Sequence, residues 1–148
     1  MRTKIRLAVL TAVGAICLTV PIVATGATGI SGHLTGSQVV NPNGGDPNGT
    51  ANISLRVNRQ KARVCFVLTY KKLSGHVTGA FIHKGDEGDI ARPIITLFEG
   101  DHASPVQACV HDVKKRLVKR LKRKPSQHYV DVTTSKYPDG AVRGQLER

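Results

Sequence analysis

The 148-residue sequence has few aromatic and acidic residues and lacks the common catalytic motifs. Aromatic residues make up 4% of the chain, tryptophan is absent, and 10 Asp and Glu residues stand against 22 Lys and Arg residues, which gives a formal net charge of +12. There is no Gly-x-Ser-x-Gly motif and no phosphate-binding glycine loop. The length excludes a multidomain enzyme or a polytopic membrane protein. We therefore expect one small domain that is not an enzyme and needs no cofactor.

The first 26 residues have the three-part pattern of a secretory signal peptide. Three basic residues among the first six precede an uncharged, largely apolar run over 7–24, and small residues then lead to a cleavage point near Gly26. An N-terminal membrane anchor is the alternative, because the apolar run is about long enough to span a bilayer. Pro21 and the small residues behind it favour cleavage, so we predict a secreted, extracellular protein.

Cleavage changes both the charge and the cysteine count. The remaining residues, 27–148, have 19 basic and 10 acidic side chains, a net charge of +9, and no longer include Cys17. Cys65 and Cys109 are then a pair, which in an exported protein indicates one disulfide bond, with two free thiols as the alternative. Neither has a second Cys or a His at ligand spacing, which argues against a metal site there.

The sequence after the signal peptide has the pattern of short strands with one late helix. Residues 51–57 alternate strictly between apolar and polar side chains, and 62–70 continue this pattern, so the two segments predict a hairpin. Further strands are expected at 77–83, 93–98, 129–133 and 141–146. About seven short strands with frequent turns predict a mainly β fold, an antiparallel sandwich or barrel. The acidic, glycine-rich segment 84–89 is expected to be a solvated loop.

One segment near the C-terminus combines helical periodicity with dense positive charge. An apolar stripe at i, i+3, i+7 and i+11 starts at Val110 and predicts a helix over about 111–124, with Asp112 as its N-cap. The rest of 27–148 is near neutral, with 11 basic against 10 acidic residues. The candidate polyanion-binding residues are the eight cations around this stripe: Lys114, Lys115, Arg116, Lys119, Arg120, Lys122, Arg123 and Lys124.

Such a dense basic segment indicates either a solvated face that raises solubility or a surface that binds a polyanion. Outside the cytoplasm, the candidate partners are anionic membrane surfaces and anionic extracellular polymers, including wall polymers and sulfated glycans. Nucleic acid is disfavoured by export and by the absence of aromatic residues for base stacking within 114–124. Any electrostatic function should therefore be sought on this helix.

The C-terminal stretch 129–146 resembles the end of a CHRD (chordin-type) domain. It reads Tyr-Val-Asp-Val-Thr-Thr, then a Pro-Asp-Gly turn, then Arg-Gly-Gln-Leu, where the family typically has Tyr-Val-Asn-Val-His-Thr, a Pro-Gly turn and Arg-Gly-Gln-Leu. Residues 34–40 resemble the family's opening strand, and 79–85 its Ala-His-Ile-His-Gly stretch. The resemblance spans about 33–146 and leaves residues 27–32 as a short linker before a domain over 33–148.

This resemblance implies an immunoglobulin-like β-sandwich in a secreted binding or structural module without catalysis. The family's histidines are metal candidates, but their positions are occupied here by Phe81, His83 and Thr133, so one histidine is retained. A lone histidine rarely holds a metal ion, and His83 is therefore a weak metal candidate that we expect to be structural. Arg143 and the two residues after it are expected to be a polar edge-strand feature.

Two other functions fit the same sequence. One is a degenerate metal-binding protein with a superoxide-dismutase-like sandwich. The other is a protein–protein interaction module that binds an extracellular protein through the exposed edge of the sandwich.

Overall fold

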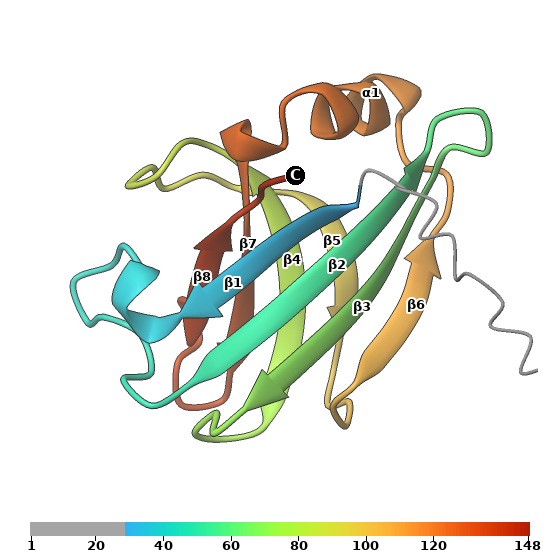
Figure 1. Cartoon of the computed structure of the whole chain (residues 1–148). Coiled ribbons are helices and arrows are strands. Elements are labelled where there is room, and N and C mark those ends of the chain that lie inside the picture. Colours follow the sequence, from blue (N-terminus) through green and yellow to red (C-terminus); the bar gives the residue numbers. More distant parts are fainter. Residues whose placement is uncertain (1–28) are drawn as a thin grey trace, which may run out of the picture.

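The computed structural model describes residues 29–148, which form eight strands, one α-helix and two short 3₁₀ helices (Figure 1). The predicted signal peptide at 1–26, including Cys17, lies outside the described residues. Within 29–148, no helix has the length and apolar character needed to cross a membrane.

All strand pairs are antiparallel and belong to one sheet in the order β5-β4-β7-β8-β1-β2-β3-β6. The strands are β1 (Ile30–Thr35), β2 (Thr50–Asn58), β3 (Arg63–Lys71), β4 (Val77–Lys84), β5 (Pro93–Glu99), β6 (Val106–Val110), β7 (His128–Thr134) and β8 (Val142–Gln145). The helices are η1 (Gly36–Gln38), α1 (Lys115–Arg123) and η2 (Pro125–Gln127).

The sheet curls into a nearly closed barrel, and this confirms the predicted antiparallel sandwich or barrel (Figure 1). The edge strands β5 and β6 approach each other, and Phe66 of β3 stacks on Phe98 of β5 with ring centroids 6.2 Å apart. The eighth strand is β6, which was not among the predicted strands and in which Val106 is the one buried residue. Edge strands bury little apolar surface, which hides them from pattern analysis.

Strict alternation places the core inside the curled sheet. On β2, Ile53 and Leu55 are 1% exposed, and on β3 Val64 and Leu68 are fully buried. Burying one such side chain stabilises the fold by about 1.5–3 kcal/mol. The side chains at the alternate positions, including Cys65 and Val67, lie on the outer face of the sheet.

Helix α1 lies across one end of the barrel (Figure 1) and closes the core there with Val118 and Leu121, which are 0% and 1% exposed. The helix begins at Lys115 and not near 111, and the expectation that Asp112 is its N-cap is wrong. Asp112 has φ 56°, in the left-handed region, whereas an N-cap has extended backbone. The chain turns there because the Val113 N–H donates to the Ala62 carbonyl at 2.9 Å.

Strand β8 lies between β7 and β1, so the interpretation of Arg143-Gly144-Gln145 as an edge-strand feature is wrong. Gly144 is required by the close approach of β1, because a Cβ built on it would lie 2.2 Å from the His33 carbonyl oxygen. At the N-terminal end of the described sequence, β1 begins at Ile30, within the segment 27–32 for which we expected a linker.

The predicted disulfide is confirmed. Cys65 of β3 and Cys109 of β6 are directly opposite each other in the ladder and are joined by an S–S bond of 2.07 Å. Both side chains lie on the outer face, so the bond fastens an edge strand to its neighbour without occupying the core.

Candidate functional site

The eight cations of the predicted polyanion-binding segment lie on and beside α1, at the end of the barrel (Figure 1). All eight are exposed, because Val118 and Leu121 occupy the inward face of the helix. Within residues 29–148, none of them forms a salt bridge, since both ion pairs of this region join a histidine to an aspartate. The protein's own carboxylates therefore do not neutralise the charge of the helix.

Five of the eight cations line one hollow of about 510 Å³, which we call the basic groove. They are joined by Lys84 at the end of β4 and by Gln127 and His128, and no acidic residue lines the groove. The five cations are Arg116, Lys119, Arg120, Arg123 and Lys124. The remaining three candidates, Lys114, Lys115 and Lys122, lie outside it. Six cations around one concavity form a site that is complementary to an anion.

The arrangement works against the stability of α1 itself. The first turn of the helix has no acidic residue, although the macrodipole favours negative charge there. Like charges four residues apart, such as Lys115 and Lys119, destabilise a helix by a few tenths of a kcal/mol per pair. The helix is held instead by its buried stripe and by Arg148, whose guanidinium donates to the Lys122 carbonyl at 2.6 Å.

His128 lies at the groove with 2% of its surface exposed. Its Nδ1 is 2.9 Å from the Lys124 carbonyl oxygen, and its buried Nε2 has no hydrogen-bond partner among the described residues. Burial lowers the pKa of His128, and the positive charges of Lys84 and Arg120 lower it further, against the opposing effect of the Lys124 carbonyl. Burial is the largest cause of this lowered pKa, and the positive charges of the groove add to it.

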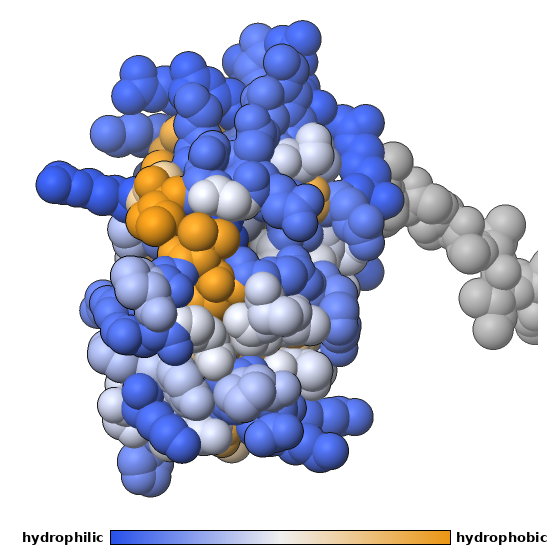
Figure 2. All heavy atoms as spheres, turned by 90° about the vertical axis from the view of Figure 1, so that its left-hand side faces the viewer, coloured by the Kyte–Doolittle hydropathy of each residue, from blue (hydrophilic) through white to orange (hydrophobic). Residues whose placement is uncertain are grey.

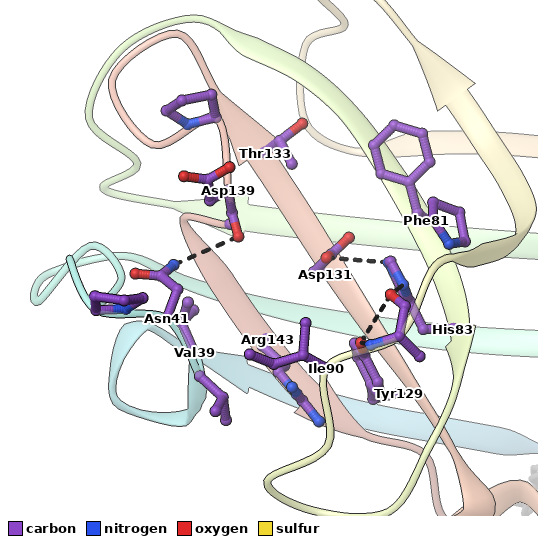
Figure 3. Close-up of a pocket in the computed structure, with 16 residues that line it drawn as sticks. Val39, Asn41, Phe81, His83, Ile90, Tyr129, Asp131, Thr133, Asp139 and Arg143 are labelled. Atoms are coloured by element: carbon purple, nitrogen blue, oxygen red, sulfur yellow. Dashed lines mark hydrogen bonds and ion pairs between the residues drawn. The ribbon is translucent and has the colours of Figure 1, made fainter.

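A second hollow, of about 420 Å³, lies on the outer face of the sheet over β4, β7 and β8 (Figure 3), and we call it the β4–β7 pocket. The register pairs Phe81 with Asp131 and Gly79 with Thr133, so the outward side chains of both strands meet there. Phe81, His83 and Thr133 all line the pocket. The positions at which the CHRD resemblance places histidines therefore belong to one site, although this chain retains one of them.

His83 is packed rather than free. Its Nδ1 lies 2.7 Å from the Ala91 carbonyl oxygen, and its Nε2 lies 3.0 Å from Oδ2 of Asp131. The second contact is close but is not aligned as a hydrogen bond, so Nε2 has no hydrogen-bond partner among the described residues. The ring stacks on Tyr129 at 4.6 Å with planes 3° apart.

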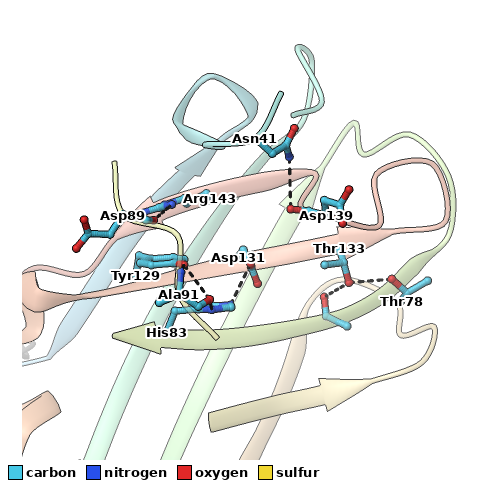
Figure 4. Close-up of polar contacts among 11 residues, drawn as sticks. Asn41, Thr78, His83, Asp89, Ala91, Tyr129, Asp131, Thr133, Asp139 and Arg143 are labelled. Atoms are coloured by element: carbon cyan, nitrogen blue, oxygen red, sulfur yellow. Dashed lines mark hydrogen bonds and ion pairs between the residues drawn. The ribbon is translucent and has the colours of Figure 1, made fainter. Parts of the chain in front are cut away.

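Arg143 completes a stack of three side chains with Tyr129 and His83 (Figure 4). Its guanidinium lies 3.5 Å from the centre of the Tyr129 ring and donates to the carbonyls of Asp89 at 2.6 Å and Asp86 at 3.2 Å. These bonds fasten the loop between β4 and β5 onto the sheet. The acidic side chains of the loop are exposed, as expected for a solvated loop, but its backbone is anchored.

A metal site does not emerge from these residues. Among residues 29–148, no group of three or more His, Cys, Asp and Glu side chains is placed to hold a metal ion. The β4–β7 pocket brings together two candidate ligands, His83 and Asp131, whereas a typical catalytic zinc site has three protein ligands.

The fold and these two hollows define a small antiparallel β module of the binding or structural class. The chain matches the CHRD domain family model over residues 30–146, and it therefore belongs to the CHRD domain family, as the resemblance predicted. CHRD domains are a non-catalytic family. Neither the curated proteins nor the solved structures that were compared contain a match to this chain.

Sequence analysis identified the cations of α1 but missed residues that other strands contribute. Lys84 joins the basic groove from β4, about thirty residues earlier in the sequence. Tyr129 and Asp131 alternate with the buried Val130 and Val132, a pattern that placed them on the outer face of a strand. Nothing in the sequence showed that β4 and Arg143 meet them there.

Proposed function

We propose that this protein is a secreted, non-enzymatic CHRD-domain module that binds anionic extracellular polymers or anionic membrane surfaces through the basic groove. The observation that carries the proposal is the set of six cations around one groove with no acidic residue in its lining. The predicted signal peptide and the disulfide are compatible with an extracellular location.

The clustering favours binding over a face that serves solubility. Charge that serves solubility is interspersed with opposite charge, whereas here the carboxylates lie elsewhere and the cations repel one another along α1. An anion within the groove would relieve this repulsion. Near an anionic surface each Lys or Arg contributes about 1 kcal/mol, so three residues contribute about 3 kcal/mol, or roughly a hundredfold in affinity.

The test compares two variants that lose the same charge. Lys119→Gln, Arg120→Gln and Arg123→Gln together neutralise the groove, and Lys71→Gln, Lys72→Gln and Lys136→Gln neutralise three exposed cations that do not line it. On a heparin column, the protein and the control variant should elute well above about 0.15 M salt. The groove variant should elute near or below that concentration. Equal elution of the two variants would show that retention depends on the net charge of the protein and not on the groove.

A second measurement distinguishes the anionic partners. Vesicles with anionic headgroups should bind the protein and the control variant more tightly than the groove variant if membrane surfaces are the target. Retention by heparin without vesicle binding would point to a glycan or another polymer. If a protein alone is recovered from envelope and culture supernatant, and equally by both variants, the interaction does not use the basic groove and the proposal is wrong.

A further inference from the structure

We propose that the β4–β7 pocket is a second binding site, which takes a primary ammonium group carried on an apolar stem. An alkylamine or a lysine side chain has this chemistry. The pocket shares no lining residue with the basic groove, so the proposal is independent of polyanion binding.

The first observation is an unused acceptor. Asp131 lies among the residues that line the pocket (Figure 3), with its Oδ2 directed at His83 and its Oδ1 buried. Among the residues that the structure describes, none donates a hydrogen bond to Oδ1. A buried acceptor without a donor destabilises the fold by about 1–3 kcal/mol, and more when it is charged. Because Oδ1 is closed to solvent while the Asp131 side chain is 16% exposed, a ligand in the pocket supplies the missing donor when this side chain rotates towards it.

Apart from His83 Nε2, which faces Asp131 without an aligned hydrogen bond, the polar groups near the pocket are already engaged (Figure 4). His83 Nδ1 faces the carbonyl of Ala91. The Tyr129 hydroxyl lies 3.0 Å from the backbone nitrogen of Ala91 and 3.4 Å from its carbonyl oxygen. The Asn41 amide donates to the Asp139 carbonyl at 3.4 Å. The pocket therefore presents acceptors to a ligand and has few donors left for an anion.

The charge of the lining agrees with this. Asp131 and Asp139 supply two carboxylates; Asp131 faces His83, which carries charge only when protonated, and Asp139 forms no ion pair within 29–148. Arg143 supplies one guanidinium, but its N–H groups donate to loop carbonyls and its plane covers Tyr129. No lysine lines the pocket. A cationic donor is thus the ligand group that this lining complements.

The rim of the pocket is apolar and is held open to solvent. Ile90 is 74% exposed and Val40 is 37% exposed, and both line the pocket. The backbone on both sides of Ile90 is anchored, because Asp89 and Ala91 are hydrogen-bonded to side chains of β4, β7 and β8. The space-filling view shows hydrophobic residues gathered on this face among hydrophilic ones (Figure 2). Fixed apolar side chains beside buried polar groups are typical of ligand sites and fit an aliphatic stem.

The first test uses three ligands with one stem: hexylamine, hexanol and hexanoate, titrated at neutral pH while the amide resonances of the protein are followed by NMR. We expect hexylamine to bind at least tenfold more tightly than either of the others, with shifts at the lining residues of the β4–β7 pocket. Equal affinity for hexylamine and hexanol, or tighter binding of hexanoate, would overturn the proposal. This comparison needs no variant and stands even if a substitution prevents folding.

The second test uses variants. Asp131→Asn should weaken hexylamine binding at least tenfold, whereas Asp101→Asn, which removes an equal charge from an exposed residue outside the pocket, should leave it unchanged. Ile90→Ser should weaken hexylamine several-fold but leave methylamine unaffected, because methylamine has no stem. Full affinity in Asp131→Asn would refute the assignment.

A blocked lysine, Nα-acetyl-lysine methylamide, identifies the source of the ammonium group. Binding as tight as that of hexylamine assigns the site to a lysine of a partner protein, and binding of hexylamine alone assigns it to a free amine. Failure of both to bind would overturn the proposal. None of these results depends on whether the basic groove binds a polyanion.

Discussion

Removal of the disulfide is expected to cost the domain a large share of its stability. The bond closes a loop of about 45 residues between positions 44 apart in sequence. In the chain-entropy model, a loop of this length restricts the unfolded chain by about 13 cal/mol/K, or about 4 kcal/mol at 25 °C. Small domains have about 5–15 kcal/mol in total. Cys65→Ala with Cys109→Ala should leave the core intact, because both side chains lie on the outer face.

Urea unfolding followed by far-UV circular dichroism measures this loss. With a slope of about 1.5–2 kcal/mol/M, the midpoint of the double variant should fall by about 2 to 3 M. The unmodified protein, once its disulfide has been reduced, should unfold at the same midpoint as the double variant. This measurement controls for the effect of the alanine side chains. A loss below about 1 kcal/mol, or a reduced protein as stable as the oxidised one, would refute the reasoning that the crosslink acts on the unfolded chain.

Three further predictions concern Asp46, His128 and the pair of positions Phe81 and Thr133. Burial raises the pKa of Asp46, but hydrogen bonds from Ser74, Asn48 and Gly49 outweigh this and hold it below its ordinary value near 3.8, so the unfolded chain takes up the proton first as the pH falls. Asp46→Asn should therefore lower the free energy of unfolding by about 2 kcal/mol at neutral pH, and this difference should shrink as acid titrates the folded carboxyl. The pKa of His128 is lowered chiefly by burial, which disfavours the charged imidazole. Below about pH 6.5 the unfolded chain therefore takes up a proton at this residue while the folded imidazole stays neutral, and the free energy of unfolding falls. Stability should thus decrease from pH 7 to 5 in urea titrations, and His128→Gln should flatten that decrease. Phe81→His with Thr133→His should create zinc binding beside His83 and Asp131, seen as a rise in the unfolding temperature with added zinc that the unmodified protein does not show.

The regular parts of the fold could be predicted because burial and periodicity coincide in them. Ile53 and Leu55 on β2 and Val64 and Leu68 on β3 alternate strictly, and the structure pairs these two strands as the sequence suggested. Strand β6 escaped prediction because it is short and its last residue, Val110, also fits the helical stripe that runs to Leu121.

The boundaries of α1 depend on backbone conformation rather than on side-chain type. Asp112 is a common N-cap residue in a suitable place, but its left-handed φ belongs to a turn that is fixed by the hydrogen bond from Val113 to Ala62. That contact joins segments about fifty residues apart. No local pattern in the sequence shows it.

The candidate sites divide in the same way. The cations of α1 all lie within residues 114–124, so the basic groove could be predicted apart from Lys84. The β4–β7 pocket could not, because it requires the register of β4 with β7 and the placement of Arg143 on an interior strand. Side chains that meet through strand pairing are dispersed in the sequence, and each alone has an ordinary structural explanation.

The most direct test of the proposed function is to locate a bound anionic polymer on the protein. Amide resonances followed during titration with a heparin-derived oligosaccharide at about 0.15 M salt should shift at Lys84 and along 116–128, and the pKa of His128 should rise as the polymer offsets the neighbouring positive charges. Resonances of the β4–β7 pocket should stay in place. Two results would contradict the account: absence of binding at this salt concentration, or resonance shifts that occur elsewhere on the surface and not at the groove.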